Sequence, residues 1–246
     1  MLTPESFVCL AGFLIEVSTP RLLVERIVYS IEHHTPLTVF FANTNFIVRC
    51  QHLHPQINHC SAMIVNDGLG VDIVTWLLFR QKFPHNMNGT DFLPFLFRRS
   101  PFLLRFFLLG SYPDVVSQAA KRIAAFGHNI VGTCDGYSSL REKGTALLDE
   151  INSSQPDVVL VALGNPLQEE WIVNNRSRLH APVVMGVGAF FDFFAQSIQR
   201  APLWLRHLNL EWFHRFLHDP RRLLRRYTWD IFLFVGLSLC RKKRCG

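Results

Sequence analysis

The sequence predicts an α/β fold with a mainly parallel sheet, helices on both faces and a basic helical appendage at the C-terminal end. Three observations support this prediction. Short runs that are apolar throughout alternate with amphipathic segments, as in a parallel sheet that is buried on both faces. Most of these runs end in Gly, Asn or Asp, which permit tight turns. Lys and Arg residues gather near the C-terminus.

The expected elements follow one another in regular alternation. Apolar runs with their following turns predict strands, and a 3.6-residue period predicts helices. The strand segments are residues 37–43, 62–70, 105–111, 128–137, 158–164 and 181–192. The helices are residues 20–33, a short one after 43, 71–80, one after 88–91, 113–126, 140–153 and 166–178. We expect one doubly wound, Rossmann-like domain over residues 1–199 and the appendage over 200–246.

The segment from Phe92 to Leu109 mixes Phe, Leu and Arg, and it can be interpreted in two ways. Its composition suits a surface that faces a membrane. We favour a core helix followed by a buried strand, because periodicity and length fit that arrangement.

Basic residues dominate the C-terminal part of the chain. Residues 196–246 hold eleven Lys and Arg against three acids, a balance of +8, whereas the whole chain carries +6. The rest of the sequence is therefore slightly acidic. A basic tail favours an anionic partner, which is a nucleic acid, the acidic headgroups of a membrane or a phosphorylated substrate.

Targeting and redox signals indicate a cytosolic protein. The first residues, MLTPESF, lack the basic start and apolar run of a signal peptide. The six cysteines form no CxxC pair, which predicts reduced thiols and no zinc site. The segment Tyr227–Cys240 is apolar but about fourteen residues long, whereas a membrane-spanning helix needs about 20. We expect it to lie in a membrane interface or against the domain.

Candidate site residues follow the strands, because ligands of open parallel sheets bind at the carboxyl ends of the strands. Asp67 follows the apolar run AMIVN and precedes Gly68, so its carboxylate is expected at the mouth of the sheet. A carboxylate with that support and access can act as a general base. A helix-capping role for Asp67 fits the sequence equally well.

Gln168 is expected in the first turn of a helix that begins at Pro166, with its amide facing the cleft as donor and acceptor. The alternative is that Gln168, Glu169 and Glu170 form a solvated first turn that the helix dipole favours.

The C-terminal arginines form a second candidate group. Arg222 and Arg225 are three residues apart and share a helical face, with Arg215 upstream. Guanidinium groups match phosphate oxygens in two-point contacts. The alternative is a purely electrostatic patch for a membrane or a nucleic acid.

Cofactor signatures are absent from the sequence. Residues 68–70 and 186–188 read Gly-x-Gly after strands, but Ile73 and Phe191 occupy the third glycine position of a dinucleotide motif. The P-loop motif and the Asp-x-Asp metal-binding pair are also missing. We therefore expect no cofactor and no metal site.

Seven motifs follow one another along the chain: NDGLG, NGTD, LLGSYP, VGTCDGY, DVVLVALGNPLQEEW, GVGAFFDFFAQ and RAPLWLRHLNLEWFHRFLHDPRR. Together they resemble the WecG/TagA/CpsF family of bacterial glycosyltransferases, glycosyltransferase family 26, over residues 37–227. The resemblance implies transfer of a sugar from a UDP-sugar to a polyprenyl-diphosphate-linked saccharide. It also implies a peripheral enzyme on the acidic cytoplasmic face of the bacterial inner membrane.

The resemblance assigns roles to individual residues. The catalytic aspartate of the family falls on Asp67, and the C-terminal arginines that complete the site fall on the three named above. The substrate-binding residues expected from the motifs are Asn43, Thr44, Gly68, Asn88, Asp91, Asn165, Gln168, Arg215, Arg222 and Arg225.

The donor sugar is inferred from finer similarities. FFANTN and NMNGTDF are most similar to the GumM-type β-1,4-glucosyltransferases of exopolysaccharide synthesis. Many family members carry an arginine where this chain has residues 85–88, and a threonine where it has Phe41. Both differences suggest another donor sugar, and we therefore expect glucose.

The leading hypothesis is an inverting hexosyltransferase in which Asp67 takes the proton of the acceptor hydroxyl as that oxygen displaces UDP. An alternative within the same chemistry is a transferase of UDP-N-acetylmannosamine or UDP-N-acetylmannosaminuronate. A second alternative is a non-enzymatic nucleic-acid-binding domain that uses the basic tail, whereas the leading hypothesis expects no nucleic-acid partner.

Overall fold

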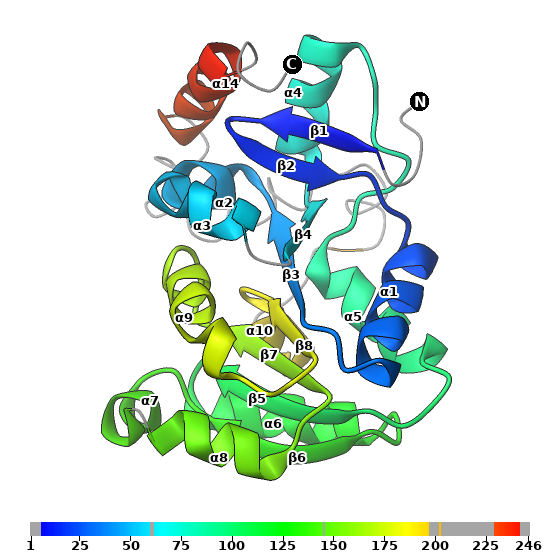
Figure 1. Ribbon diagram of the computed structural model, residues 1–246, viewed down its shortest axis with the longest axis vertical. Coiled ribbons are helices and arrows are strands. Elements are labelled where there is room, and N and C mark those ends of the chain that lie inside the picture. Colours follow the sequence, from blue (N-terminus) through cyan, green and yellow to red (C-terminus); the bar gives the residue numbers. More distant parts are fainter. Residues whose placement is uncertain (1–5, 60–61, 145, 197–201, 203–228, 242–246) are drawn as a thin grey trace.

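The computed structural model describes residues 6–59, 62–144, 146–196, 202 and 229–241. At its centre lies an eight-stranded sheet in the order β1-β2-β4-β3-β8-β7-β5-β6 (Figure 1). The strands are β1 Phe7–Leu10, β2 Phe13–Glu16, β3 Leu37–Ala42, β4 Ala62–Asn66, β5 Arg105–Gly110, β6 Asn129–Cys134, β7 Val158–Ala162 and β8 Val183–Gly186. All neighbours pair in parallel except β1 and β2. The predicted α/β class with a mainly parallel sheet is confirmed.

Helices cover both faces of the sheet (Figure 1). One layer contains α1 Pro20–Glu32, α5 Gly89–Arg99, α6 Pro113–Ala124 and α10 Phe190–Phe194. The other contains α2 Thr44–Arg49, η1 Gln51–Leu53, α3 His54–His59, α4 Leu69–Phe79, α7 Ser138–Lys143, α8 Ala146–Ser154, α9 Leu167–Asn175 and α14 Trp229–Arg241. A short η2 turn, Arg176–Arg178, leads into β8. In β3, Phe40 packs into one layer and its neighbours Val39 and Phe41 into the other, which is why the strands are apolar at every position.

The main difference from the predicted elements is the hairpin of β1 and β2, because no strand was predicted before Pro20. Ala11 and Gly12 form its two-residue turn with φ values of 51° and 94°. Turns of this kind match the twist of paired strands. Two predicted helices are also divided: 140–153 becomes α7 and α8, and 166–178 becomes α9 and η2.

The segment from Phe92 to Leu109 lies in the core, as favoured. Helix α5 buries Phe92 and Phe97, and β5 is buried over five of its six positions. The Phe97 ring contacts Phe106 edge-on, with 5.4 Å between ring centroids. The abundance of phenylalanine in this segment therefore serves packing between the helix and the sheet.

The C-terminal apolar segment forms α14, which packs against α2, α4 and β1. Phe234 is buried there, and Asp230 lies 3.9 Å from the Arg49 guanidinium. This placement confirms that the segment lies against the domain. In the part of the chain that is described, no helix is long and apolar enough to cross a membrane. The division at residues 199 and 200 stays a prediction, because residues 203–228 lie outside the described residues.

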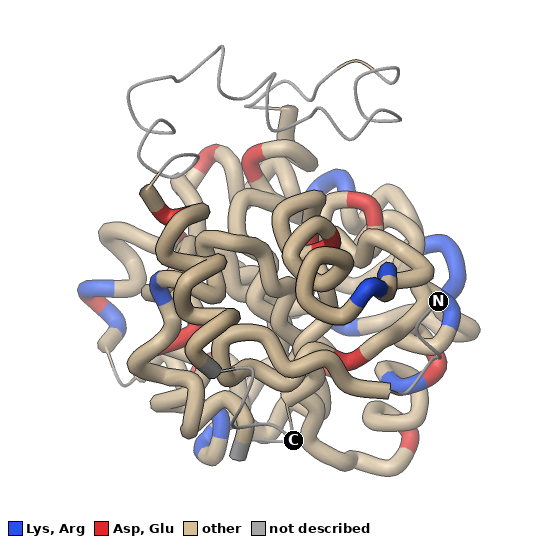
Figure 2. The backbone as a smooth tube through the Cα atoms, turned by 90° about the horizontal axis from the view of Figure 1, so that it is seen from above, with Lys and Arg blue, Asp and Glu red and all other residues tan. Residues whose placement is uncertain are grey.

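Charges of both signs are interspersed around the described part of the molecule (Figure 2). Some of them pair locally, as in the ion pair of Lys143 with Glu150. The strongly basic stretch found in the sequence falls mostly on residues outside the described ranges.

Cys9 in β1 is disulfide-bonded, whereas Cys50, Cys134 and Cys240 are free thiols. The prediction that the cysteines are reduced is therefore wrong for Cys9. Spacing along a chain does not reveal which cysteines meet in the fold, and this explains the error.

Candidate active site

The turns after β3 to β8, which run parallel to one another, lie along one edge of the sheet (Figure 1). In space, the turns after β4, β3 and β8 adjoin one another, and those after β7, β5 and β6 continue the row. Asp67, Asn43 and Asn165 follow β4, β3 and β7, so all three lie on this edge. Residues far apart in the sequence therefore come together where ligands of open sheets bind.

Asn43 and Asp67 contact each other. The Asn43 side-chain nitrogen donates to Asp67 Oδ2 at 3.1 Å, and Asn43 Oδ1 accepts from the Phe46 backbone N–H at 3.0 Å. The Asp67 backbone N–H donates to the Ala42 carbonyl at 2.8 Å. Asn43 thus caps α2 and at the same time orients the Asp67 carboxylate, which remains half-buried.

The N-cap position of α4 is occupied by Gly68 and not by Asp67, which disfavours the helix-capping alternative for Asp67. Gly68 has a φ of 89°, which side chains rarely adopt, so the turn after Asp67 requires glycine. Its backbone N–H donates to Asn86 Oδ1 at 2.9 Å. Asn66 donates from its side chain to the His85 carbonyl at 2.8 Å. The segment 85–88 therefore supports the turn that carries Asp67.

Asp72 lies in the first turn of α4, and its Oδ1 accepts from the Asn66 side chain at 3.1 Å. The pKa of Asp72 is raised to about 6, mainly by burial and to a smaller extent by the nearby charge of Asp67, while the Asn66 amide opposes the shift. A second carboxyl that titrates close to neutral pH therefore lies near the candidate base.

Three other predicted residues lie at helix starts. Thr44 is the first residue of α2. Asn88 caps α5: its Oδ1 accepts from the Asp91 N–H at 2.9 Å, and its Nδ2 donates to Asp91 Oδ2 at 2.9 Å. This reciprocal pairing is a sufficient structural role for both. Their contacts with a substrate stay predictions.

Phe41, which replaces the threonine of many family members, lies in the core. Its side chain is buried in the core, with 5.9 Å between its ring centroid and that of Phe92. It also lies directly under Gly89, where an added Cβ would be 3.3 Å from the ring. Phe41 therefore packs β3 against the start of α5.

Gln168 is buried in the first turn of α9, and both ends of its amide are engaged. Its Oε1 accepts from the Gly188 N–H at 2.9 Å, and its Nε2 donates to Glu169 Oε1 at 2.6 Å. Gln168 therefore links the turn after β7 to the turn after β8. The solvated-turn alternative is wrong for Gln168 and for Glu169.

Asn165, whose peptide bond to Pro166 is cis, extends this contact toward α2. Its Nδ2 donates to Glu169 Oε1 at 2.7 Å, and its Oδ1 accepts from Asn45 Nδ2 at 3.1 Å. The turns after β3, β7 and β8 are thereby joined by side-chain hydrogen bonds.

Glu169 carries the most unusual electrostatic environment of the edge. Its side chain is 0% exposed, and burial raises its pKa to about 7, while the Gln168 amide and other hydrogen-bond donors oppose the shift. The neighbouring Cys50 thiol has a raised pKa as well, first through burial and then through the charge of Glu169.

The buried Glu169 carboxyl predicts a pH dependence of stability. Its pKa rises from an ordinary 4.5 to about 7 in the folded protein, so between these values the native state holds a proton that the unfolded chain releases. The contribution of this proton to the free energy of unfolding is complete below pH 4.5 and is lost as the pH rises through about 7. The loss amounts to about 3 kcal/mol. Glu169→Gln removes this titration. Its free energy of unfolding, measured relative to that of the wild type, should therefore rise by about 3 kcal/mol between acid pH and about pH 8.

Urea unfolding of both proteins at a series of pH values measures this difference. Asp72 titrates in both proteins, so its contribution cancels. Glu170→Gln is the matched control, because Glu170 is partly exposed beside His52. A stability difference between Glu169→Gln and the wild type that stays constant with pH contradicts the prediction.

Two exposed tyrosines lie at the far end of the same edge. Tyr112 follows β5 and Tyr137 follows β6, and their rings stack with 4.4 Å between centroids and 14° between planes. Ser111, next to this pair, donates from its hydroxyl to Asp192 Oδ1 at 3.0 Å. The edge therefore offers a flat aromatic surface beside a carboxylate.

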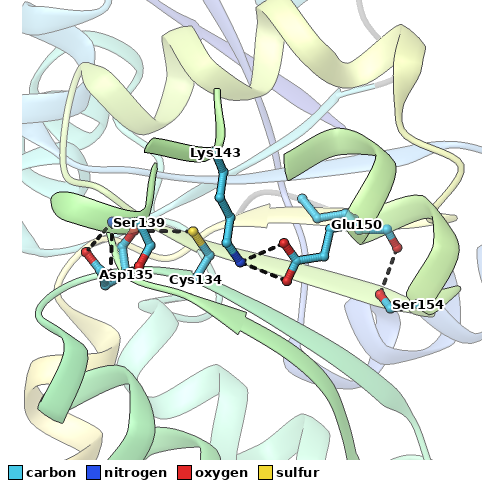
Figure 3. Close-up of polar contacts among 7 residues, drawn as sticks. Cys134, Asp135, Ser139, Lys143, Glu150 and Ser154 are labelled. Carbon is cyan, nitrogen blue, oxygen red and sulfur yellow. Dashed lines mark hydrogen bonds and ion pairs between the residues drawn. The ribbon is translucent and has the colours of Figure 1, made fainter. Parts of the chain in front are cut away.

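Asp135 fixes the turn that carries Tyr137. Figure 3 shows its carboxylate beside Ser139. Its carboxylate accepts from the Tyr137 N–H at 2.9 Å and from the hydroxyls of Ser138 and Ser139. The Ser139 hydroxyl in particular holds the pKa of Asp135 below its ordinary value. This ionised carboxylate keeps the aromatic surface in a defined position.

Sequence reasoning missed several residues of this edge: Asn45, Asn66, Asp72, Tyr112, Tyr137 and Glu169. The two tyrosines did carry a signal, because each stands one or two residues after a strand-ending Gly or Asp. Arg215, Arg222 and Arg225 lie outside the described residues, so their predicted role stays a prediction. Within the described ranges, no group of three His, Cys, Asp or Glu side chains could hold a metal ion.

Known proteins match most of this chain. The sequence is 36% identical over 165 residues to the N-acetylglucosaminyldiphosphoundecaprenol N-acetyl-beta-D-mannosaminyltransferase of Bacillus subtilis (strain 168), covering 66% of this chain and 63% of that protein. It is 31% identical over 193 residues to the Staphylococcus aureus (strain MW2) protein of the same name, covering 76% of this chain and 72% of that protein. The sequence model of the glycosyl transferase WecG/TagA/CpsF family matches residues 8–245. The chain belongs to the glycosyl transferase WecG/TagA/CpsF family.

Proposed function

We propose that this protein transfers an N-acetylmannosaminyl group from a UDP-linked donor to a lipid-diphosphate-linked saccharide, with inversion at the anomeric carbon. The names of the two relatives, which specify N-acetylmannosaminyl transfer to N-acetylglucosaminyl-diphosphoundecaprenol, support this alternative. They give no support to the expected glucose donor or to exopolysaccharide synthesis. The observation that carries the proposal is the Asp67 carboxylate, held by Asn43 at the carboxyl edge of the sheet.

Asp67 is the proposed general base. The Asn43 side-chain amide donates a hydrogen bond to one carboxylate oxygen, Oδ2, at 3.1 Å, and this contact orients the carboxylate. The acceptor hydroxyl would give its proton to the carboxylate while its oxygen attacks the anomeric carbon from the face opposite UDP. The bond from that carbon to the diphosphate oxygen breaks in the same displacement, so the sugar is inverted once.

UDP leaves as a diphosphate, and its growing negative charge needs positive partners. The proposed partners are backbone N–H groups at the strand ends together with Arg215, Arg222 and Arg225. Each charge-assisted contact contributes roughly 1.5 to 3 kcal/mol.

The donor would lie along the edge, with its uracil on the tyrosines and its sugar near Asp67. Neighbouring strands are about 4.8 Å apart, and four such steps separate β4 from β5, which gives a span of roughly 20 Å. An extended nucleoside diphosphate sugar has a comparable length. The stacked Tyr112 and Tyr137 supply the flat apolar surface that a base requires.

Tyr137→Ala is therefore expected to raise the KM for the donor about 10-fold with little change in kcat, because stacking of one base contributes about 1 to 3 kcal/mol. Tyr137→Phe should keep the wild-type KM, since it keeps the ring. Steady-state kinetics with varied donor concentration measures both. Tyr29→Ala is the control, because Tyr29 is also exposed and stacked, against His33 on α1. Equal KM values for the Tyr137 and Tyr29 alanine variants would show that the uracil of the donor does not stack on Tyr137.

Helices α4 and α14 are the proposed membrane-binding face. Each presents large exposed apolar residues, which are Ile73, Trp76 and Leu77 on α4 and Trp229, Phe232 and Leu233 on α14. The two helices pack against each other. An exposed apolar face of this size is typical of interaction surfaces, and the basic tail adds attraction to acidic lipid. Flotation with vesicles that contain acidic lipid tests this, and Phe232→Glu combined with Trp76→Glu should abolish the binding.

A donor panel tests the proposed function. Purified protein is incubated with N-acetylglucosaminyl-diphosphoundecaprenol and either UDP-N-acetylmannosamine, UDP-N-acetylmannosaminuronate or UDP-glucose. Formation of a disaccharide lipid with the first donor, in the presence of a chelator, is the expected result. Transfer of glucose alone would restore the glucose hypothesis, and absence of transfer from every donor would overturn the proposed activity.

A further inference from the structure

Glu169 differs from the other acids of the edge because it is completely buried and accepts two side-chain amides on one oxygen. Asn165 Nδ2 and Gln168 Nε2 lie 2.7 Å and 2.6 Å from Glu169 Oε1. Both distances are short, as expected for amide donors on a carboxyl acceptor. A single oxygen therefore holds two of the predicted substrate-binding residues.

The opposite ends of the two amides are also occupied. Gln168 Oε1 accepts from the Gly188 N–H at 2.9 Å, and Asn165 Oδ1 accepts from Asn45 Nδ2 at 3.1 Å. Rotation of either amide by 180° would place its oxygen against the Glu169 oxygen and its N–H groups against another N–H. Each amide is therefore restricted to one orientation.

The backbone of β8 leaves room for this arrangement. A Cβ at Gly186 would be 3.1 Å from Gln168 Nε2 and 3.2 Å from the Phe40 ring. The Gln168 amide thus packs directly on the end of β8. A residue larger than glycine at position 186 would press on the amide.

A purely structural role explains the burial of Glu169 poorly. Burying a carboxyl is unfavourable unless the charge is paired, and within the described residues no cation lies at ion-pair distance from Glu169. The adjacent Glu170 shows the ordinary arrangement, because it is partly exposed and lies 3.0 Å from His52 Nε2. A buried carboxyl that has no counter-ion and accepts hydrogen bonds from two amides is typical of a group that orients the side chains of a functional site.

We propose that Glu169 is the positioning residue of the transfer site, which holds Asn165 and Gln168 in the single orientation that the sugar donor meets. This inference rests on the proposed function. Glu169 makes no contact with the donor itself and acts through the two amides. The dipoles of the two amides are fixed before the substrate binds, so the activation free energy includes no term for ordering them.

The experiment compares Glu169→Leu, Glu169→Gln and the control Glu170→Gln in the transfer assay, each on the full chain. Glu169→Leu is expected to lower kcat/KM about 10-fold or more, since both amides lose their common acceptor. Glu169→Gln keeps an acceptor oxygen at the same place and should remain within about threefold of the wild type. Glu170→Gln should be unchanged.

A double-mutant cycle separates positioning from a loss of folding. If Glu169 acts through the two amides, adding Glu169→Leu to a variant that already carries Asn165→Ala and Gln168→Ala should slow transfer by no more than about twofold. Glu169→Ala replaces Glu169→Leu in the cycle if the leucine variant does not fold.

The outcomes are distinct. Losses that multiply in the cycle, or equal rates for Glu169→Leu and Glu170→Gln, overturn the positioning role and leave the transferase activity standing. A wild-type protein that transfers no sugar from any UDP donor overturns the proposed function and, with it, this inference. Non-additive losses with rescue by glutamine support it.

Discussion

Asp67→Asn is expected to lower the rate of sugar transfer by about 10²- to 10⁴-fold, the range that a positioned general base contributes. The substitution keeps the size and the hydrogen-bonding oxygen of the side chain, so Asn43 can still donate to it. What is lost is the ability to accept a proton from the acceptor hydroxyl. The effect should therefore appear in kcat, while the affinity for UDP and the melting temperature stay close to those of the wild type.

Transfer kinetics, UDP binding by calorimetry and thermal unfolding together measure this result. The matched control is Asp149→Asn, the same chemical change on the exposed side of α8. A turnover rate of Asp67→Asn within a few-fold of the wild type would show that Asp67 only stabilises the turn after β4. Loss of UDP binding together with loss of rate would instead assign it to the donor site.

Replacing Arg222 and Arg225 together by alanine is expected to lower kcat by about 10²- to 10⁴-fold, because two charge-assisted contacts to the leaving diphosphate contribute roughly 3 to 6 kcal/mol. The spacing of the two arginines predicts that they share one helical face, so that both would reach one diphosphate. Lysine at both positions should restore only part of the rate, since an ammonium cannot make a two-point contact.

Single-turnover measurements with saturating donor separate this effect from weaker binding to a membrane. The reaction is run with a detergent-solubilised acceptor, so that vesicle affinity does not enter. Arg178→Ala serves as the control, because Arg178 is exposed just before β8, at the opposite edge of the sheet. If the double alanine variant turns over at the wild-type rate, the arginines have no part in the departure of UDP.

The parts of the fold that the sequence predicts are those whose burial leaves a continuous pattern. Strands β3, β5 and β7 are covered on both faces, so nearly every position must be apolar, and such runs are visible without a structure. The β1–β2 hairpin was missed because each strand has four residues and leaves Phe7 and Leu14 exposed at the border of the sheet. Short edge strands give too few residues for periodicity to be decisive.

The candidate site was predictable in its location and much less in its contacts. Asp67 and Asn43 each follow an apolar strand, and the rule for parallel sheets puts both on one edge. Their hydrogen bond depends on β3 and β4 being neighbours, which is a property of the whole topology. Glu169 was misassigned for the same reason: an acid in the first turn of a helix is ordinarily solvated, and only the packing of α9 near Cys50 buries it.

The position of β8 has a consequence for how the chain reaches its native state. It is the last strand among the described residues, yet it lies in the middle of the sheet, paired with β3 on one side and with β7 on the other. Without β8 no strand pairing joins β1–β4 to β5–β7, so each of these groups would present an open edge where β8 belongs. Open strand edges are sites of intermolecular pairing, so nascent or truncated chains that end before Val183 should aggregate. The pairing of β8 with β3 and β7 should come late in folding.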